Sequence, residues 1–196
     1  MGVARPVPGP MADDEAFSPP VGASAGMRLA SRRSPRLRSG AGEQGESTGG
    51  DRVQALSVQQ PWAFAIARGG RSVSNQDAPT AYRGPLLIHA SMRVDLKACD
   101  NPLIRAAGWD PRDPLATIGA VIAVADLEDV CSAAVAGGSC DCGPWAEPGF
   151  HHWHLDGVHA LPRPIVTIGH PGLWQPNPSL VNEVIAMFAT AAATDK

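Results

Sequence analysis

The chain has 196 residues, of which 44% are hydrophobic, and its formal net charge is −3 at pH 7. This length accommodates one globular domain with a tail, and the acidic balance argues against non-specific binding to long phosphate backbones, which requires a basic surface. Because the sequence contains neither a transmembrane-length apolar run nor a secretory signal, we expect a soluble cytoplasmic protein without a membrane partner.

Residues 1–52 are rich in Pro, Gly, Ser, Ala and Arg and show no hydrophobic periodicity. A segment of this composition buries too little apolar surface to offset the entropy lost when it orders. We therefore predict a disordered tail over residues 1–52 and a folded domain over residues 53–196. The domain holds nine basic and thirteen acidic residues, so the acidic surplus belongs to the folded part of the chain.

The domain opens with a strand, a helix, a polar loop and a second strand. Residues 53–58 alternate apolar and polar side chains, which is typical of a half-buried strand. A short apolar helix begins at Gln60-Pro61-Trp62, with proline near its first turn, and Gly69-Gly70 ends it. Residues 71–77 are predicted to form the polar loop. The apolar residues 85–89 that follow predict a strand in the core.

The middle of the domain contains helical segments, one further strand and a long loop. Residues 93–108 have helical spacing interrupted by Asn101-Pro102, so we predict two short helices or one broken helix. Residues 117–127 are rich in β-branched side chains and predict a buried strand. Repeated glycines and prolines indicate that residues 132–150 form a loop.

The last part of the chain predicts two strands and a helix. The strands cover residues 153–160 and 165–168, and two prolines separate them. Residues 180–193 form a helix, and its apolar residues recur at the spacing of one helical face. Ser179 directly precedes this helix and is the expected N-cap, since a serine hydroxyl can accept a hydrogen bond from the first free N–H groups.

Two blocks of residues resemble a known family. The matching positions of the first block are Leu56, Ser57, Gln60, Pro61, Trp62, Ala63, Ile66, Gly69, Tyr82, Arg83, Gly84, Ile88, His89, Ala90 and Ser91. The second block consists of Gly143-Pro144-Trp145, His152-Trp153-His154-Leu155 and Gly172-Leu173-Trp174. Their order and spacing resemble the ASCH domain, a small β-barrel that is related to the PUA fold and associated with RNA. The resemblance covers residues 53–174 and implies an α+β fold, a small PUA-like β-barrel with flanking short helices.

The resemblance also implies a ligand pocket at the polar loop, residues 71–77. Where the family carries a lysine, a glutamate and an arginine, this chain has Arg71, Ser74 and Gln76, so its pocket loop is divergent. Planar amide and guanidinium groups can read base edges or bind phosphate, and an aromatic ring can stack on a base. We predict an RNA- or nucleotide-binding module. Its expected ligand contacts are Trp62, Arg71, Ser74, Asn75, Gln76, Arg83 and His89.

Enzymatic activity is the alternative to simple binding. One branch of the family hydrolyses N4-acetylcytidine with a lysine that activates a threonine, and these two positions hold Arg71 and Ser74 here. Ser74 is the nucleophile if the protein is such a hydrolase or a ribonuclease, but an arginine stays protonated and cannot act as its base. A binding module is therefore favoured. A degenerate relative that serves as a protein-interaction scaffold remains a third hypothesis, and His89 has a structural alternative as a buried hydrogen-bonding residue.

A group of cysteines and histidines raises the question of a metal. Cysteine and histidine are the ligands that zinc prefers, and a glycine-rich loop between them can fold around an ion. The Cys-x-Cys step is tighter than the usual two-residue spacing, however, and cytosolic proteins commonly keep free thiols. We therefore expect no cofactor, with zinc as the alternative. Its candidate ligands are Cys131, Cys140, Cys142, His152 and His154.

Overall fold

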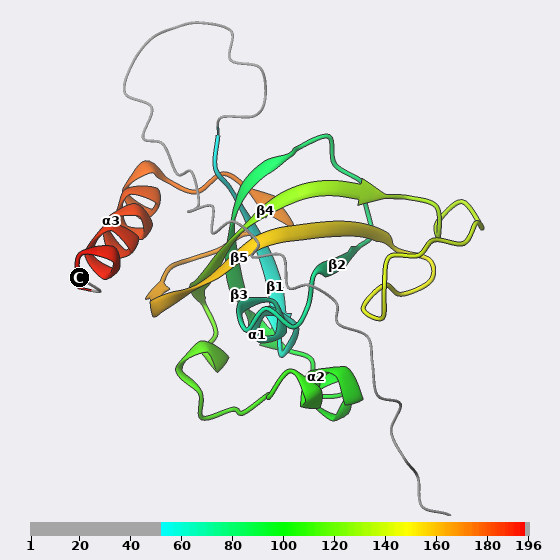
Figure 1. Cartoon of the computed structure of the whole chain (residues 1–196), viewed down its shortest axis with the longest axis horizontal. Helices are drawn as coiled ribbons and strands as arrows, with labels where there is room; N and C mark the ends of the chain where they lie inside the picture. Colours follow the sequence, from blue (N-terminus) through cyan, green and yellow to red (C-terminus); the bar gives the residue numbers. More distant parts are fainter. Residues whose placement is uncertain (1–51, 195–196) are drawn as a thin grey trace, which may run out of the picture. The chain divides into compact units, whose positions relative to one another are not determined.

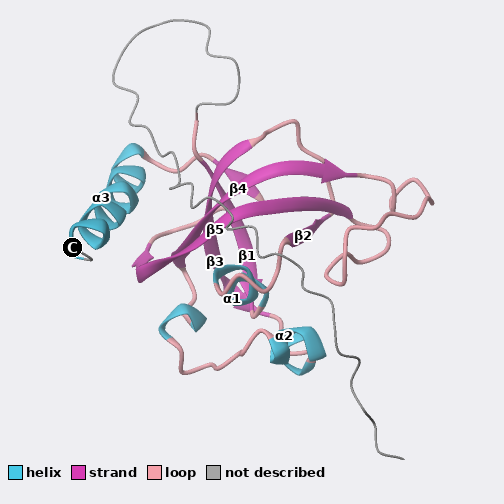
Figure 2. Cartoon of the chain, in the orientation of Figure 1, coloured by secondary structure: helices cyan, strands magenta, loops and turns pink. Residues whose placement is uncertain are grey.

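The structure is a computed structural model that describes residues 52–194, with side chains to residue 190. The predicted tail, residues 1–52, lies outside the described residues except for Arg52. The strands are β1 (Gln54–Gln60), β2 (Val73–Gln76), β3 (Gly84–Val94), β4 (Ala120–Cys131), β5 (His151–Val166) and β6 (Leu173–Trp174). The helices are α1 (Trp62–Ala67), α2 (Pro102–Ala106) and α3 (Pro178–Thr194), with the 3-10 turns η1 (Ala98–Asp100) and η2 (Pro114–Ala116) (Figures 1 and 2). Within residues 52–194, no helix combines the length and hydrophobicity of a membrane span.

All six strands belong to one mixed sheet in the order β2-β5-β4-β3-β1-β6. β1 and β3 run parallel, and the other neighbours are antiparallel. The sheet curves into a half-barrel whose two edges are β2 and β6 (Figure 2). One curved sheet with a few short helices is an α+β fold, so the predicted fold class is confirmed.

Both faces of the central strands are buried, because a helix covers each face. On β3, Leu86 and Ile88 belong to the apolar cluster that contains α1, whereas Leu87 belongs to a second cluster that contains Leu180 and Val184 of α3. All five of these side chains are buried. Successive residues of a strand point to opposite faces, so β3 contributes to both clusters and forms the centre of the core.

Gln60 connects the end of β1 to the neighbouring segments and is fully buried. Its amide nitrogen donates hydrogen bonds to the carbonyl oxygens of Leu115 and Thr117, each at 2.8 Å. Its side-chain oxygen accepts a hydrogen bond of 3.0 Å from the backbone N–H of Phe64 in α1. The amide therefore satisfies three backbone groups at once, which explains a buried glutamine at this position.

The polar segment after α1 is a strand and not the predicted loop. Val73 to Gln76 form β2, which pairs antiparallel with β5 at the edge of the sheet. Val73 packs into an apolar cluster with Ile104 and Trp145, while Ser74 faces the other side of the sheet beside its pairing partner Trp153. Only four residues take part and three of them are polar, so the sequence pattern resembles a loop.

The two predicted closing strands are one continuous strand, β5. The prolines at positions 162 and 164 lie between the pairs Ala123–Ala160 and Val121–Ile165, where the register of β4 and β5 shifts. Such an irregularity tolerates proline because the backbone there does not need to donate ladder hydrogen bonds. The strand therefore continues through a segment in which the sequence suggested a break.

The helical predictions are confirmed with one change at a helix terminus. The segment interrupted at residue 101 forms two short pieces, η1 and α2, and the C-terminal helix is α3. The cap of α3 is Asn177, whose side-chain oxygen accepts a 2.8 Å hydrogen bond from the N–H of Leu180. Ser179, the predicted cap, instead donates its hydroxyl to that same oxygen at 2.7 Å. Asn177 lies two residues further upstream because α3 begins at Pro178, earlier than its apolar residues indicate.

Candidate functional site

The structure distributes the seven predicted ligand contacts over four places. Ser74 and Gln76 share one side of β2, whereas Trp62, Arg71 and Asn75 lie near the 132–150 loop. Arg83 lies beside Asp129, and His89 on β3 contacts Ser57 of β1 and Trp174 of β6. They therefore do not form one pocket. Only Gln76 borders the hollow described next.

A hollow of about 400 Å³ lies between the two edge strands of the half-barrel. We refer to it as the edge hollow. Its lining consists of Gln76, Asp77, Ala78, Pro79, Thr80, Trp153, Gly172 and Leu173. Gln76 ends β2 and Leu173 begins β6, so the site is located where the curved sheet is open. A volume of this size is within the range of small-ligand sites in proteins.

Gln76 lines the edge hollow, and one end of its side-chain amide is anchored to the protein. Its nitrogen donates a 2.9 Å hydrogen bond to the hydroxyl of Ser74, which is only 1% exposed. Its carbonyl oxygen has no hydrogen-bond partner among residues 52–194. Since no buried side-chain nitrogen or oxygen in that range lacks a partner, this oxygen is open to solvent. The side chain therefore presents a free acceptor whose orientation is fixed by Ser74.

Trp153 forms an apolar wall of the edge hollow and is 4% exposed. Its indole N–H donates a 3.1 Å hydrogen bond to the carbonyl oxygen of Ala78, which ties the segment after β2 to β5. Trp153 belongs to a family motif that does not indicate a pocket residue. Its pairing with Ser74 brings it to the site, and this pairing is not visible in the sequence.

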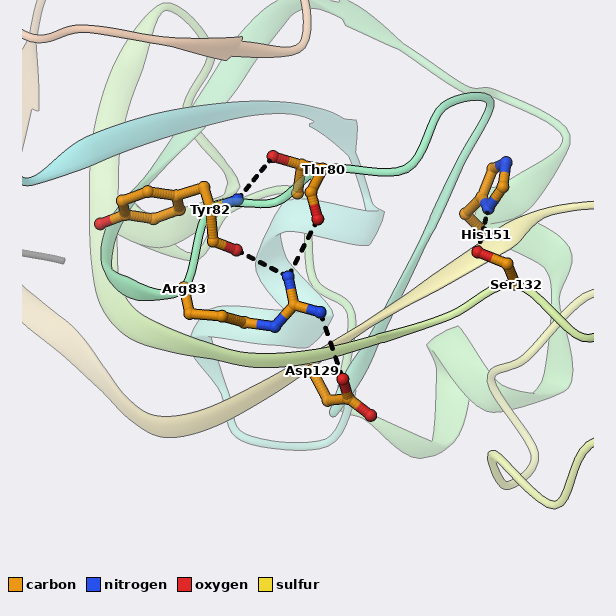
Figure 3. A network of polar contacts seen from close by, with 6 residues as sticks. All are labelled: Thr80, Tyr82, Arg83, Asp129, Ser132 and His151. Atoms are coloured by element: carbon orange, nitrogen blue, oxygen red, sulfur yellow. Dashed lines mark hydrogen bonds and ion pairs between the residues drawn. The ribbon is translucent and has the colours of Figure 1, made fainter. Parts of the chain in front are cut away.

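Arg83 contacts the backbone of Thr80, one of the residues that line the edge hollow (Figure 3). Its guanidinium donates to the carbonyl oxygens of Thr80 and Tyr82 at 2.9 and 2.8 Å and forms an ion pair of 3.2 Å with Asp129. Hydrogen bonds from the backbone N–H of Val130 and from Arg83 hold the pKa of the Asp129 carboxyl below its usual value. Arg83 therefore orients Thr80, a lining residue, without itself lining the hollow.

Arg71 is almost completely buried on the opposite side of β2, with 4% of its surface exposed. Its guanidinium carbon lies 4.7 Å from the ring centroid of Trp62 and 5.9 Å from that of Trp145, and its Nε donates to the carbonyl of Val73 at 2.7 Å. Burial lowers its pKa from 12.5 to about 10, and the Glu147 carboxylate opposes this shift. Arg71 is thus a charged residue at neutral pH that packs against two tryptophan rings, which contact each other edge-to-face.

Asn75 connects the same side of β2 to the 132–150 loop. Its amide nitrogen donates to the carbonyl of Trp145 at 3.0 Å, and its oxygen accepts from the backbone N–H of Glu147 at 3.2 Å. Both partners are backbone groups of one loop. Asn75 therefore fixes the position of this loop against β2.

His89 belongs to a buried network between three strands. Trp174 donates its indole N–H to the hydroxyl of Ser57 at 3.1 Å, and this hydroxyl lies 3.1 Å from Nδ1 of His89. Nε2 of His89 lies 3.3 Å from the carbonyl oxygen of Thr167. The backbone of Gly169 passes so close to the imidazole that a Cβ there would collide with it. Burial lowers the pKa of His89, which is consistent with a neutral, structural imidazole.

A second constellation lies at the base of the 132–150 loop. The thiols of Cys131, Cys140 and Cys142 and one ring nitrogen of His152 all lie within 4.8 Å of one another. We refer to these four residues as the Cys3His cluster. The cysteines are free, and Nδ1 of His152 lies 3.2 Å from the thiol of Cys140. Burial and the neighbouring thiols of Cys140 and Cys131 raise the pKa of Cys142 to about 12.

Two histidines close to His152 in the sequence, His151 and His154, do not belong to the Cys3His cluster. Nδ1 of His151 lies 2.8 Å from the hydroxyl of Ser132 (Figure 3). His154, a candidate ligand in the sequence analysis, lies about 7 Å further along β5, where it pairs with Asp129. The strand spacing therefore separates His154 from the three thiols.

No protein-family model matches the chain. No curated protein matches it either. Among solved structures, the chain is similar to ASCH from Zymomonas mobilis, with 15% identity, a TM-score of 0.44, and coverage of 69% of this chain and 95% of the other. A mutant form of that protein gives 14% identity, a TM-score of 0.43 and the same coverage. Both structures are of ASCH, the family whose motifs this sequence resembles.

Proposed function

We propose that the domain binds a nucleotide, free or as an unpaired residue of an RNA, with the base in the edge hollow. The observation that carries the proposal is the amide of Gln76, which is held by Ser74 and has an unpaired oxygen directed to solvent beside an aromatic wall. An amide offers a donor and an acceptor in one plane, which is the arrangement that recognises the edge of a base.

The charges around the edge hollow favour recognition of the base over recognition of phosphate. Asp77 is the only charged residue that lines it, and the nearest cation described above, Arg83, is engaged with Thr80 and Asp129. A protein that binds mainly through phosphates presents several unpaired cations. We therefore expect weak dependence on salt and no affinity for duplexes, in which the base edges are paired.

Binding is favoured over hydrolysis by the surroundings of Ser74. A serine nucleophile requires a base within hydrogen-bond reach. Among the described residues the hydrogen-bond partner of the Ser74 hydroxyl is the Gln76 amide, which is not a base. The role that the geometry supports for Ser74 is to orient Gln76.

The test is isothermal titration of the full chain with the four common nucleosides, their monophosphates and short single-stranded RNAs. Gln76→Ala should weaken binding of the best ligand about 5- to 150-fold, because a lost base contact costs about 1–3 kcal/mol. Gln59→Ala is the matched control, since Gln59 is an exposed glutamine on β1. Binding to no member of the set, or equal binding by wild type and Gln76→Ala, would overturn the proposal. Product formation that depends on Ser74 would replace it with a hydrolase.

A further inference from the structure

We propose that Cys131, Cys140, Cys142 and His152 bind one Zn²⁺ ion as a closed structural site. The four side chains supply three sulfur ligands and one nitrogen ligand, which is an established ligand set of structural zinc. Zinc with these ligands is tetrahedral, with Zn–S distances of about 2.3 Å, so its ligand atoms lie about 3.8 Å apart. The observed limit of 4.8 Å requires only small side-chain movements to reach this geometry.

The sheet holds one half of the ligand set in place. Cys131 is the last residue of β4, and His152 is its pairing partner in β5. Directly paired residues have Cβ atoms about 4.5–5.5 Å apart and point to the same face of the sheet. Two ligands are therefore positioned by the β4–β5 ladder, independently of the loop that carries the other two.

The orientation of His152 is that of a metal ligand. Its Nε2 lies 2.8 Å from the carbonyl oxygen of Glu147, so this nitrogen carries the proton and donates it to the carbonyl. Nδ1 then has a free lone pair and faces Cys140. Histidine ligands of metals commonly donate the second ring N–H to a carbonyl or carboxylate, which fixes the tautomer. The imidazole is also 1% exposed, so the surrounding protein restricts its rotation.

The 132–150 loop needs a cross-link that its apolar residues do not provide. It spans 19 residues without a helix or strand, and Trp145 is its only buried residue. Ordering each residue costs about 1–2 kcal/mol of conformational entropy, and one buried tryptophan offsets only a small part of that cost. A zinc ion would join Cys140 and Cys142 to the ends of β4 and β5. Its binding free energy offsets the entropy cost of ordering the loop, because metal binding to such ligands stabilises the fold directly.

Binding exchanges three thiol protons for one ion. The three thiols become thiolates, the imidazole stays neutral, and three protons are released to solvent, so the occupied site carries a net charge of −1. All four positions around the metal are filled by protein, which leaves no open position for water or substrate. The site is therefore structural and not catalytic.

The test is the metal content of the full chain, expressed with zinc in the medium and purified under reducing conditions without chelator. Mass spectrometry of the metal should give about one equivalent of zinc. Cys142→Ser and His152→Ala should lose the metal, whereas the matched controls Cys99→Ser and His154→Ala should retain it. Cys99 contacts the backbone of Asp95, away from the cluster, and His154 lies outside it.

A second measurement uses the wild-type protein, so that it remains informative if the variants of the zinc-binding residues do not fold. The wild-type protein, stripped of metal and kept reduced, is titrated with Co²⁺ and then with Zn²⁺. Tetrahedral thiolate ligation of Co²⁺ gives visible absorption bands together with sulfur-to-metal charge transfer in the near ultraviolet, and Zn²⁺ should abolish both stoichiometrically. A wild-type protein that contains no zinc and gives no cobalt spectrum would overturn the proposal, as would zinc loss in His154→Ala. Because the readout is metal, failure here is distinct from failure to bind nucleotides.

Discussion

Substitution of Arg71 by alanine separates a structural role from a ligand-binding role. Its guanidinium contributes about 2 kcal/mol through stacking on desolvated aromatic rings and about 2 kcal/mol through the charged hydrogen bond to Val73. Removing the buried charge also relieves a desolvation penalty, which offsets part of the lost free energy. Burial disfavours the charged form of Arg71, as the lowered pKa of this side chain indicates. We expect the free energy of unfolding to fall by a net amount of about 2 kcal/mol.

Urea unfolding monitored by circular dichroism measures this effect. A loss of about 2 kcal/mol moves the urea midpoint by about 1 M at a slope of about 2 kcal/mol/M. Arg71→Lys should recover little, since an ammonium lacks the planar stacking surface and the Nε donor. Arg112→Ala is the control, because Arg112 is exposed, and it should change stability by less than about 0.5 kcal/mol. An unchanged midpoint in Arg71→Ala together with weaker nucleotide binding would refute the structural role and restore the ligand contact predicted from the sequence.

Two further predictions follow from buried polar side chains. Gln60→Ala should cost about 3 kcal/mol in urea unfolding, because it leaves two buried backbone groups and one partly buried group without partners, whereas exposed Gln59→Ala should change the midpoint little. The pKa of His89 is lowered in the folded state, so below pH 6.5 the unfolded state binds more protons and stability falls as the pH falls. The difference in melting temperature between pH 7.5 and 5.5 should therefore be smaller in His89→Gln; an equal difference in both proteins would exclude this contribution.

The elements that the sequence predicts well are those whose burial follows a simple period. The second half of β1 alternates between buried and more exposed residues. β3 and β4 contain continuous apolar runs, because a helix covers each face of the central sheet. β2 cannot be predicted in this way, because a four-residue edge strand of mostly polar side chains has no recognisable hydrophobic period. Its strand character comes from pairing with β5, a tertiary contact.

The edge hollow illustrates what sequence reasoning cannot supply. The family motif indicates Gln76, but Gly172 and Leu173, which also line the hollow, lie almost a hundred residues further along the chain. The same motif indicates Arg71, and its burial against Trp62 and Trp145 depends on the fold of the 132–150 loop. Motif spacing locates segments, whereas the direction of each side chain is set by the face of the strand on which it lies.

The Cys3His cluster is a site that residue spacing in the sequence fails to indicate. The spacing in the sequence argues against a zinc site, because Cys140 and Cys142 are separated by a single residue. The register of β4 and β5 changes that judgement, since it places Cys131 directly opposite His152. The evidence for the cluster is therefore the pairing of Cys131 with His152. The register of a hairpin with a long loop cannot be read from the sequence.

β2 connects the two proposed sites. Its inner side carries Ser74 and Gln76 at the edge hollow, and Asn75 on its other side is hydrogen-bonded to the loop that the Cys3His cluster anchors. An edge strand of four residues with a single strand neighbour is held weakly by its own ladder. If both proposals hold, zinc holds the loop against one side of β2, and the nucleotide contacts Gln76 on the other side. Because both events favour the ordered strand, each must strengthen the other by the same free energy.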